Sequence, residues 1–425
     1  MTSSDPRQIY ATAAALHRAD RLDEAERLYR QVLEADPRHA DARHRLGVIE
    51  QQRGRPAAAV ELIRSAIALS GGSAGAHYNL ALALYDLDRL EEAAEACRAA
   101  LRAKPDFLPA LYTLGLSLKD LGRLDQAIAA YAAVTARDPD FAEAHYGESF
   151  ARLLAGDFAG GWPKYEWRRR VFPQRAAYSA PQWRGEAIAG KTLLIHAEQG
   201  LGDTIQFARY VKPAAEKGAR IVFEVQPALL KLFSGFPGVE TLICFGDPVP
   251  PHDLQCPLLS LPALFETIPA ASCLSAEPIA SAQRIGVAWR GNPQHSEDRR
   301  RSLSAAQMAA CFAGTGLNPV CLQKDATPEE LAAFTPVELS DFGMTASVIA
   351  GLDLVVTVDT VVAHLAGALG KPVWTLLGFA PDWRWQQKRE DSPWYPSMRL
   401  FRQQEPGDWN PVIDKVREGI CRIRN

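Results

Sequence analysis

Apolar and small residues recur every 34 positions through the first third of this 425-residue chain. Each period holds two runs with the apolar spacing of an amphipathic helix, and so predicts a helix pair. The register is carried by small residues (Ala25, Ala59, Ala93, Ala127), by prolines (Pro37, Pro105, Pro139, with Gly71 in the series), by first-helix leucines (Leu46, Leu80, Leu114) and by second-helix residues (Tyr29, Cys97, Tyr131). Stacked helix pairs bury their apolar faces on one another. We therefore predict four units over residues 6–141 and a degenerate fifth from Ala142.

This pattern resembles the tetratricopeptide repeat. The fifth position of each unit carries a ring: Tyr10, His44, Tyr78, Tyr112 and Tyr146. Two interpretations stay open. Either Tyr78, Tyr112 and Tyr146 line a concave face and bind an extended peptide, or they pack between adjacent helices.

The pattern changes near Lys191, where short apolar runs bounded by turn residues begin. They predict strands at residues 192–196, 221–225, 241–245 and 254–258, and then at 285–289, 320–323, 354–358 and 373–377. The residues from Gly200 to Asp203 predict a tight turn, and residues 204–217 predict an amphipathic helix. Strands that alternate with helices form parallel sheets, which bind ligands at the carboxyl ends of their strands.

Aromatic residues and arginines fill the segment between these regions. We interpret it as a capping helix followed by a linker that contains Pro173, Pro181 and Gly185. A second stretch of small residues and prolines, 269–278, separates two α/β units. The predicted fold is α + α/β, with a repeat solenoid over residues 1–155, the cap and linker over 156–190, and two Rossmann-like domains over 191–275 and 276–425.

Charge and composition argue against several classes of protein. A net charge of −3 without long basic runs does not suit a general binder of nucleic acid or anionic membranes. The polar start predicts no secretory signal, and the most apolar stretch, residues 352–369, predicts no membrane span because it contains Asp353, Asp359 and His364. Seven cysteines without a Cys-x-x-Cys pair are typical of reduced thiols and predict a cytoplasmic location.

Two motifs carry a more specific resemblance: Gly202-Asp203 at the head of the first α/β helix, and the run from Asp359-Thr360 through His364 to Pro372. They resemble the heptosyltransferase family, glycosyltransferase family 9. Residues 156–410 also resemble a bacterial group that fuses such a domain to tetratricopeptide repeats and includes proteins implicated in glycosylating flagellin. The resemblance implies a GT-B pair of domains and a nucleotide-sugar donor.

The resemblance implies that the second motif holds the donor through Asp359, Thr360 and His364. A helix that begins directly after a strand also presents free N–H groups to a diphosphate. Other predicted donor residues are Asn292, Lys371 and three arginines, Arg290, Arg299 and Arg301. The guanidinium groups of the arginines match phosphate or carboxylate oxygens. The structural alternatives are a buried histidine, a solvated arginine run and a lysine that complements a helix dipole.

Glycosyl transfer to a hydroxyl needs a base. Asp203 matches the aspartate that the family uses, and the alternative is that Asp203 only caps its helix. The predicted acceptor or sugar pocket comprises Gln199, Gly202, Asp382, Trp383 and Arg384, with Asp382 as a second candidate base. We predict no metal and no cofactor beyond the co-substrate, because the Asp-x-Asp pairs fall in repeat turns (Asp86 with Asp88, Asp138 with Asp140).

Two other functions remain open. A dinucleotide-dependent oxidoreductase is suggested by Gly200-x-Gly202 and by Glu224 about 20 residues later. Ile205 replaces its third glycine, however, and Asp203 would repel a pyrophosphate. The other is a non-catalytic repeat adaptor with a degenerate transferase domain. We favour a metal-independent glycosyltransferase whose repeats recruit a protein acceptor, with no nucleic-acid partner. The sequence does not identify the donor: the resemblance implies ADP-heptose, and a cytidine-linked nonulosonic acid suits the arginines as well.

Overall fold

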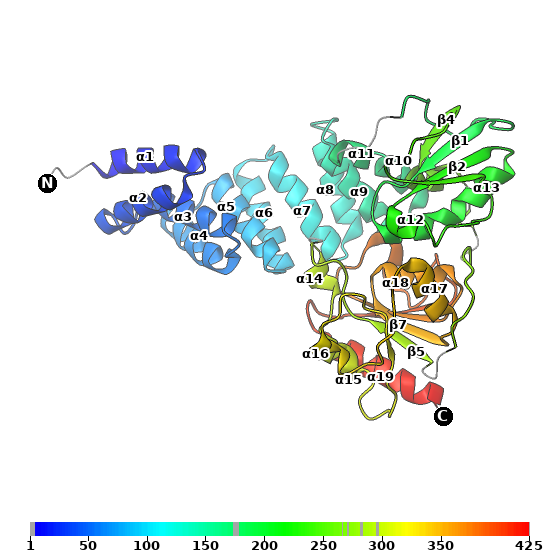
Figure 1. Cartoon of the computed structure of the whole chain (residues 1–425). Helices are drawn as coiled ribbons and strands as arrows, with labels where there is room; N and C mark the ends of the chain where they lie inside the picture. The colour runs from blue at the N-terminus through cyan, green and yellow to red at the C-terminus, as the bar shows by residue number, and fades with distance from the viewer. Residues whose placement is uncertain are drawn as a thin grey trace. The chain divides into compact units, whose positions relative to one another are not determined.

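The computed structural model describes residues 5–172, 178–265, 267–269, 272–280, 284–294 and 297–424. The chain divides into two compact units, Met1–Arg152 and Leu153–Asn425 (Figure 1). Pro173 of the predicted linker lies outside the described residues, as do Ala270 and Ala271 of the predicted inter-domain stretch. No helix in the described ranges is long and apolar enough to cross a membrane.

The first unit consists of consecutive helix pairs. They are α1 (Pro6–Arg18) with α2 (Leu22–Ala35), α3 (Ala40–Gln52) with α4 (Pro56–Ser70), α5 (Ala74–Asp86) with α6 (Leu90–Ala103), and α7 (Leu108–Asp120) with α8 (Leu124–Thr135). Each helix packs against the next one along the chain. A fifth first helix, α9 (Ala142–Leu154), follows. The four predicted units and the start of the fifth are confirmed.

The backbone repeats with the same period as the sequence. The turn after each first helix contains one residue in the left-handed conformation, namely Asp20 (φ 57°), Gly54 (70°), Asp88 (57°), Gly122 (72°) and Gly156 (85°). Glycine and, less often, aspartate adopt this conformation at little steric cost. Successive helix pairs therefore reverse direction through equivalent turns.

Large and small residues fit together in the core of the repeats. All four register alanines are fully buried. Tyr131 is also fully buried, and a methyl group added at Gly115 or Gly147 would lie within 2.8 Å of its ring. These two helix-interior glycines therefore make room for the tyrosine that carries the second-helix register.

Polar contacts connect the first helices of neighbouring repeats. His44 bonds Asn79 at 2.9 Å, Tyr85 donates to Asp120 at 2.6 Å and His17 bonds Gln52 at 3.1 Å, each across 35 positions. The fifth-position tyrosines are half-buried against neighbouring rings: Tyr78 on Phe107, Tyr112 on Tyr131 and Phe141, and Tyr146 on Phe150. The tyrosines thus pack on rings of their own or of neighbouring segments, and a peptide-binding role stays a prediction.

The second unit contains two parallel sheets. The first lobe has the strand order β3-β2-β1-β4, and the second has β6-β5-β7-β8-β9. The strands are β1 (Thr192–His196), β2 (Arg220–Val225), β3 (Thr241–Cys244), β4 (Leu254–Pro257), β5 (Ile285–Ala288), β6 (Val320–Cys321), β7 (Leu354–Val358), β8 (Val373–Leu377) and β9 (Met398–Arg402). Eight were predicted. The edge strand β9 was missed because its arginines at 399 and 402 interrupt the apolar run.

The remaining helices connect and cover these sheets. They are α10 (Phe158–Tyr165), α11 (Arg168–Val171), α12 (Leu201–Phe207), η1 (Ala208–Tyr210), α13 (Val211–Glu216), η2 (Pro227–Leu229), η3 (Leu258–Leu264), α14 (Asp298–Arg301), α15 (Ala305–Ala310), α16 (Pro328–Leu331), α17 (Phe342–Ala350), α18 (Val361–Ala368), η4 (Trp383–Trp385) and α19 (Asn410–Arg424).

The predicted continuous helix over residues 204–217 is wrong in two respects. It begins earlier, at Leu201, so that Gly202 and Asp203 are helical rather than part of a preceding turn. It is also broken by the 3-10 turn η1. Pro213 explains the break, because proline cannot donate to the carbonyl four residues earlier and its ring clashes with that group.

Strand order places two switch points in the second unit. From β1 the chain passes to β2 on one side and later returns to β4 on the other, and β5 is flanked in the same way by β6 and β7. Ligands of open α/β sheets bind at such points, beyond the carboxyl ends of the strands. Because Ala288 pairs with Thr357, the residues after β5 lie beside those after β7.

Candidate functional site

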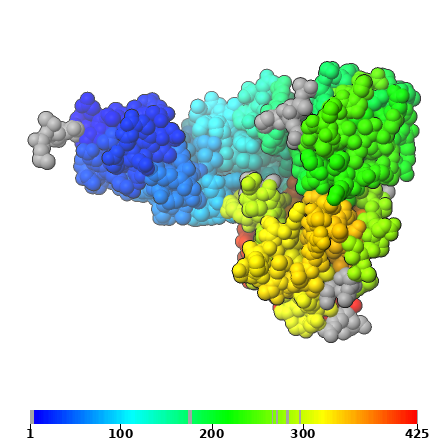
Figure 2. Space-filling view, viewed as in Figure 1, coloured from blue at the N-terminus to red at the C-terminus, as the bar shows by residue number. Residues whose placement is uncertain are grey.

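The two lobes of the second unit meet where α12 of the first packs against α18 of the second (Figures 1 and 2). A methyl group added at Gly202 would lie 2.9 Å from Cδ2 of His364. Glycine at 202 therefore permits the close approach of the two helices. The same contact brings the two sequence motifs, one from each lobe, to a single seam.

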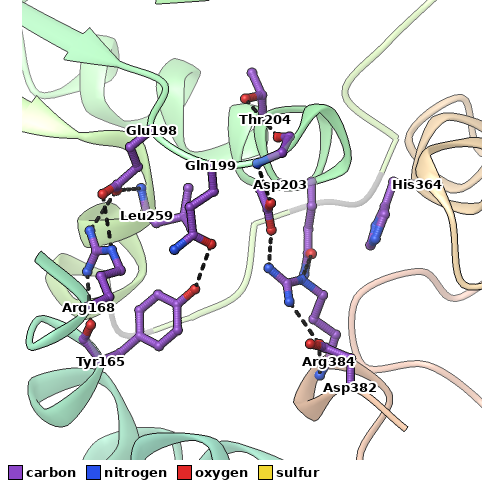
Figure 3. Close-up of polar contacts among 12 residues, drawn as sticks. Tyr165, Arg168, Glu198, Gln199, Asp203, Thr204, Leu259, His364, Asp382 and Arg384 are labelled. Carbon is purple, nitrogen blue, oxygen red and sulfur yellow. Dashed lines mark hydrogen bonds and ion pairs between the residues drawn. The ribbon is translucent and has the colours of Figure 1, made fainter. Parts of the chain in front are cut away.

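Asp203 lies at this seam, in the first turn of α12. One carboxylate oxygen accepts a hydrogen bond from the Gly200 backbone N–H at 2.8 Å, and the other pairs with Arg384 (Figure 3). Gly200, not Asp203, is the N-cap residue, so Asp203 supplies only the reciprocal bond of a capping box. Its side chain is 20% exposed. Burial raises the pKa of Asp203, and the Arg384 charge opposes this rise.

Arg384 connects the lobes through three polar groups. Its Nε donates to Gln206 Oε1 at 2.6 Å, one terminal nitrogen donates to Asp382 Oδ1 at 2.8 Å and the other to Asp203 (Figure 3). Its guanidinium also lies 4.4 Å from the centre of the Trp383 ring. The side chain is 9% exposed. Each of its three side-chain nitrogen atoms thus donates within the protein, and the role of Arg384 in shaping a substrate pocket stays a prediction.

Trp383 requires a similar correction. It is 1% exposed and packs edge-on against Trp162 and stacked on Phe207. A side chain this deeply packed supports the loop and does not line an open pocket. Asp382, the second candidate base, accepts from the Arg384 backbone N–H as well as from its side chain.

The second motif lies at the start of α18. Thr360 is the N-cap residue, and its hydroxyl accepts from the Val362 N–H at 3.2 Å. Asp359 Oδ1 lies 4.0 Å from Nε2 of His364. His364 contacts Tyr395 OH through Nδ1 at 3.0 Å. Burial lowers the pKa of His364 well below its usual value, so the ring is neutral near pH 7.

Burial also raises the pKa of Asp359, and the nearby Asp382 adds to this effect. Arg301 counteracts it. Three carboxylates and two guanidinium groups therefore interact at the seam. This arrangement places a negatively charged base candidate beside positive groups suited to an anionic substrate.

The predicted donor residues of the loop after β5 separate in the structure. Arg290 turns away from the seam to Glu330 and the Asp325 carbonyl. Arg301 lies over Gly291, bonds Asp298 at 3.3 Å and acts on Asp359. Asn292 and Arg299 are exposed. Arg301 therefore acts on Asp359, whereas a donor-binding role for Arg299 and Arg301 as a pair stays a prediction.

Lys371 lies outside the site. Its backbone N–H bonds the Ala366 carbonyl at 3.0 Å and closes the carboxyl end of α18 after Gly370 (φ 71°). Strand β8 begins two residues later, so Lys371 lies at the amino ends of the strands. This position does not support the predicted donor-binding role, because ligands of such sheets gather at the opposite edge.

A cavity of about 310 Å³ lies beside the carboxyl end of β6. Its lining includes Cys321, Gln323, Lys324, Leu331 and the segment 336–340. The Gln323 side chain accepts from the backbone N–H groups of Trp289 and Arg290. The cavity therefore adjoins the loop after β5, on the side away from β7.

The sequence missed several residues that hold this site together. Arg168 is 1% exposed and bonds Glu198 and Ser260, while Tyr165 donates to Gln199 at 3.3 Å (Figure 3). The aromatic and arginine content of residues 161–168 was the available signal, but we had assigned it to a solenoid cap. In the structure this segment supports the loop that leads to Asp203.

A further missed residue ties the lobes. Arg209 of η1 is buried, donates to the Trp394 carbonyl at 2.6 Å and lies over the Tyr395 ring. Tyr395 in turn bonds His364. The first-lobe helices are thus tied to the second lobe through Arg209 as well as through the contacts of Arg384.

The dinucleotide alternative and the residues available for a metal site can be compared with the structure. Glu224, the candidate ribose-binding acid, is buried and accepts a hydrogen bond from Tyr178 OH. This contact engages the carboxylate that would bind a ribose and so weakens the dinucleotide alternative. Across the described ranges, no cluster of three or more His, Cys, Asp or Glu side chains is arranged to hold a metal ion.

Comparison with known proteins adds family context. Residues 338–412 match glycosyltransferase family 9 (heptosyltransferase). Residues 18–100 match subunit 3 of the anaphase-promoting complex, or cyclosome, and residues 88–149 match the tetratricopeptide repeat. Protein FlbA of Caulobacter vibrioides is 26% identical over 317 residues, covering 62% of this chain and 52% of FlbA. The chain thus spans about half the length of this relative.

Solved structures also resemble the chain. YrrB, described as a TPR protein with an unusual peptide-binding site, has a TM-score of 0.37 and 22% identity, covering 40% of this chain and 88% of YrrB. MamA has a TM-score of 0.35 and 27% identity, covering 36% of this chain and 91% of MamA.

The chain therefore combines a tetratricopeptide solenoid with two parallel-sheet α/β lobes, the second of which contains the segment similar to heptosyltransferases. This confirms the resemblance and the fold class predicted from the sequence. The family 9 match supports a glycosyltransferase. Its matched range includes Asp359, Thr360, His364 and Arg384 but not Asp203. The role of Asp203 is therefore a proposal based on geometry.

Proposed function

We propose that this protein transfers a sugar, without a metal ion, from a nucleotide-activated donor to a hydroxyl group of a protein that the solenoid recruits. The match to glycosyltransferase family 9 supports the reaction class. The meeting of Asp203 with Asp359 and His364 at one seam, through the close approach of Gly202 to His364, is the observation that carries the proposal.

Asp203 is the proposed base. As the acceptor oxygen bonds to the anomeric carbon, the hydroxyl proton passes to the Asp203 carboxylate. The bond between that carbon and the donor phosphate oxygen breaks, and its electron pair leaves with the nucleotide. Burial raises the pKa of Asp203 toward the range in which a carboxylate is an effective base. A carboxylate oxygen has two lone-pair sites, so each Asp203 oxygen can accept one further hydrogen bond.

The second lobe is the proposed donor side. The N-terminus of α18 and the charge of Arg301 favour the phosphate that develops negative charge as it leaves. Thr360 contributes mainly as the cap that orders this helix start. The 310 Å³ cavity beside β6 is large enough for the nucleobase part of a donor, because small-molecule sites begin near ~300 Å³.

The solenoid is the proposed acceptor-recruiting part, and a flagellin-like protein is the proposed acceptor. Tetratricopeptide repeats are extended surfaces for protein binding. All seven cysteines are free thiols, which suits a reducing, cytoplasmic compartment. The Tyr78, Tyr112 and Tyr146 edges are the proposed contact sites.

Purified protein tested by thermal shift against nucleotides and nucleotide sugars will identify the donor class. Asp203→Asn should then retain donor binding and lose transfer, while Asp391→Asn, which removes an exposed partner of Arg389, should retain both. Deletion of residues 1–141 should reduce acceptor use far more than donor hydrolysis. Transfer by Asp203→Asn at the normal rate would refute the assigned base, and a shift with NAD alone would refute the donor class.

A further inference from the structure

Arg384 is a deeply buried charged group at the lobe seam, and it faces carboxylates from both lobes. Asp203 belongs to α12 of the first lobe, and Asp382 precedes η4 of the second. Gln206 occupies the remaining Nε direction at 2.6 Å. Three fixed acceptors, together with the Trp383 ring, hold the guanidinium in one orientation.

Arg384 and the backbone N–H of Gly200 favour the negative charge of Asp203, whereas its other surroundings oppose it. Burial acts against the ionised form, as do Asp382 and Glu198. His364, the titratable side chain that α18 brings beside Gly202, stays neutral and supplies no positive charge. Asp359 of the second lobe interacts electrostatically with Arg301 and Arg384. Tyr165 of α10 also interacts with Arg384. Arg384 therefore supplies the main charge that favours carboxylate over carboxylic acid.

We infer that Arg384 is a positioning residue for Asp203, which keeps this carboxylate ionised and aimed into the seam and thereby makes the base depend on lobe closure. This inference rests on the proposed function, in which Asp203 accepts the acceptor proton. When the lobes separate, η4 withdraws from α12 and Asp203 loses its counter-charge. When they close, the same contact restores an ionised base beside the donor lobe.

The test measures the titration of Asp203 without requiring activity. Unfolding of the full chain is followed by tryptophan fluorescence at several pH values for the wild type and Asp203→Asn, and the difference between them reports the ionisation of Asp203. The same pair is then measured in the Arg384→Gln background. We expect the midpoint of the difference curve to move upward by about one pH unit or more, because an adjacent opposite charge lowers a carboxyl pKa by roughly one to three units.

Two further variants separate positioning from general damage. Arg384→Lys keeps the charge but not the planar fork, and should give an intermediate midpoint. Arg389→Gln removes a nearby arginine that pairs with Asp391 and Gln386, and should leave the midpoint unchanged. An unchanged midpoint in Arg384→Gln, or an equal change in Arg389→Gln, would overturn the inference.

The activity measurement distinguishes this inference from the proposed function. With ADP-heptose or a cytidine-activated nonulosonic acid as the probe, the acid limb of kcat/KM in Arg384→Gln should move to higher pH with the stability midpoint. If the stability midpoint moves but the wild type transfers neither sugar, the proposed donor classes fail while the Arg384–Asp203 relation holds. If transfer occurs and its acid limb does not move, the positioning role is refuted.

Discussion

Replacing Arg168 with methionine should destabilise the second unit and leave the solenoid intact. The guanidinium is 1% exposed, bonds Glu198 at 2.6 and 3.2 Å, and also bonds Glu166 and the Ser260 hydroxyl. Glu198 is itself largely buried, with 13% of its side chain exposed. Methionine can fill the space of the arginine stem but leaves a buried carboxylate without its partner.

The expected magnitude follows from that unpaired charge. Breaking a buried ion pair from one side costs about 3–5 kcal/mol. In a unit of this size, 1 kcal/mol corresponds to a shift in Tm of roughly 2–4 °C, so the transition should fall by about 6–20 °C. The Leu259 N–H also bonds Glu198, so the loop leading to Asp203 should loosen before the whole unit unfolds.

Tryptophan fluorescence is a selective assay for this change. All nine tryptophans lie between positions 162 and 409, and therefore all belong to the second unit. Far-UV circular dichroism follows the helical solenoid in the same sample. The fluorescence transition of Arg168→Met should shift strongly, with a smaller change in the helical signal.

Arg170→Met is the matched control. Arg170 is on the same short helix α11 but is exposed, with its guanidinium 4.6 Å from the centre of the Trp167 ring. Its replacement should change stability by about 1 kcal/mol or less. Equal shifts for the two variants, or an unchanged fluorescence transition in Arg168→Met, would show that the buried network does not stabilise the second unit.

Three further predictions concern the seam, the first sheet and the chemistry. Gly202→Ala should lower stability by up to about 2 kcal/mol, since overpacking against His364 costs ~1–3 kcal/mol while helix propensity returns up to ~1, and should reduce transfer. Gly75→Ala is the control, because its added methyl group would meet only the Ser73 hydroxyl oxygen at 3.8 Å, and its stability should be unchanged or higher. Loss of transfer in Gly75→Ala, or unchanged transfer in Gly202→Ala, would contradict this prediction. Burial lowers the pKa of His196 to about 4, so protonation favours the unfolded chain. About 3 kcal/mol of stability should therefore be present above pH ~6.5 and lost as the pH falls toward 4. In measurements of the free energy of unfolding against pH, His196→Gln should not show this loss. Parallel curves for the wild type and His196→Gln would refute the prediction. Transfer should persist in a chelator, and its loss and recovery with manganese would disprove metal independence.

Local patterns predicted much of the fold. The 34-residue register is a property of short segments, because each unit repeats the same helix pair and left-handed turn residue from Asp20 to Gly156. The strands could likewise be predicted, since buried parallel strands are continuous apolar runs. The break in the helix over residues 204–217 could also have been predicted, because proline at position 213 disfavours a continuous helix.

The site was only partly predictable, because its partners are distant in sequence. Asp203 and Arg384 are 181 positions apart, and neither residue type indicates that the two would pair. Sequence likewise could not show that Trp383 is packed. By contrast, the predicted strand at residues 373–377 already placed Lys371 at the amino end of a strand.

The sequence alone determined the repeats, the strands and the two motifs, because these depend on backbone preference and on periodic burial within each segment. Only the tertiary structure decided which charges meet. Ion pairing depends on the distance between side chains from separate lobes, and that distance is set by the packing of α12 against α18 around Gly202.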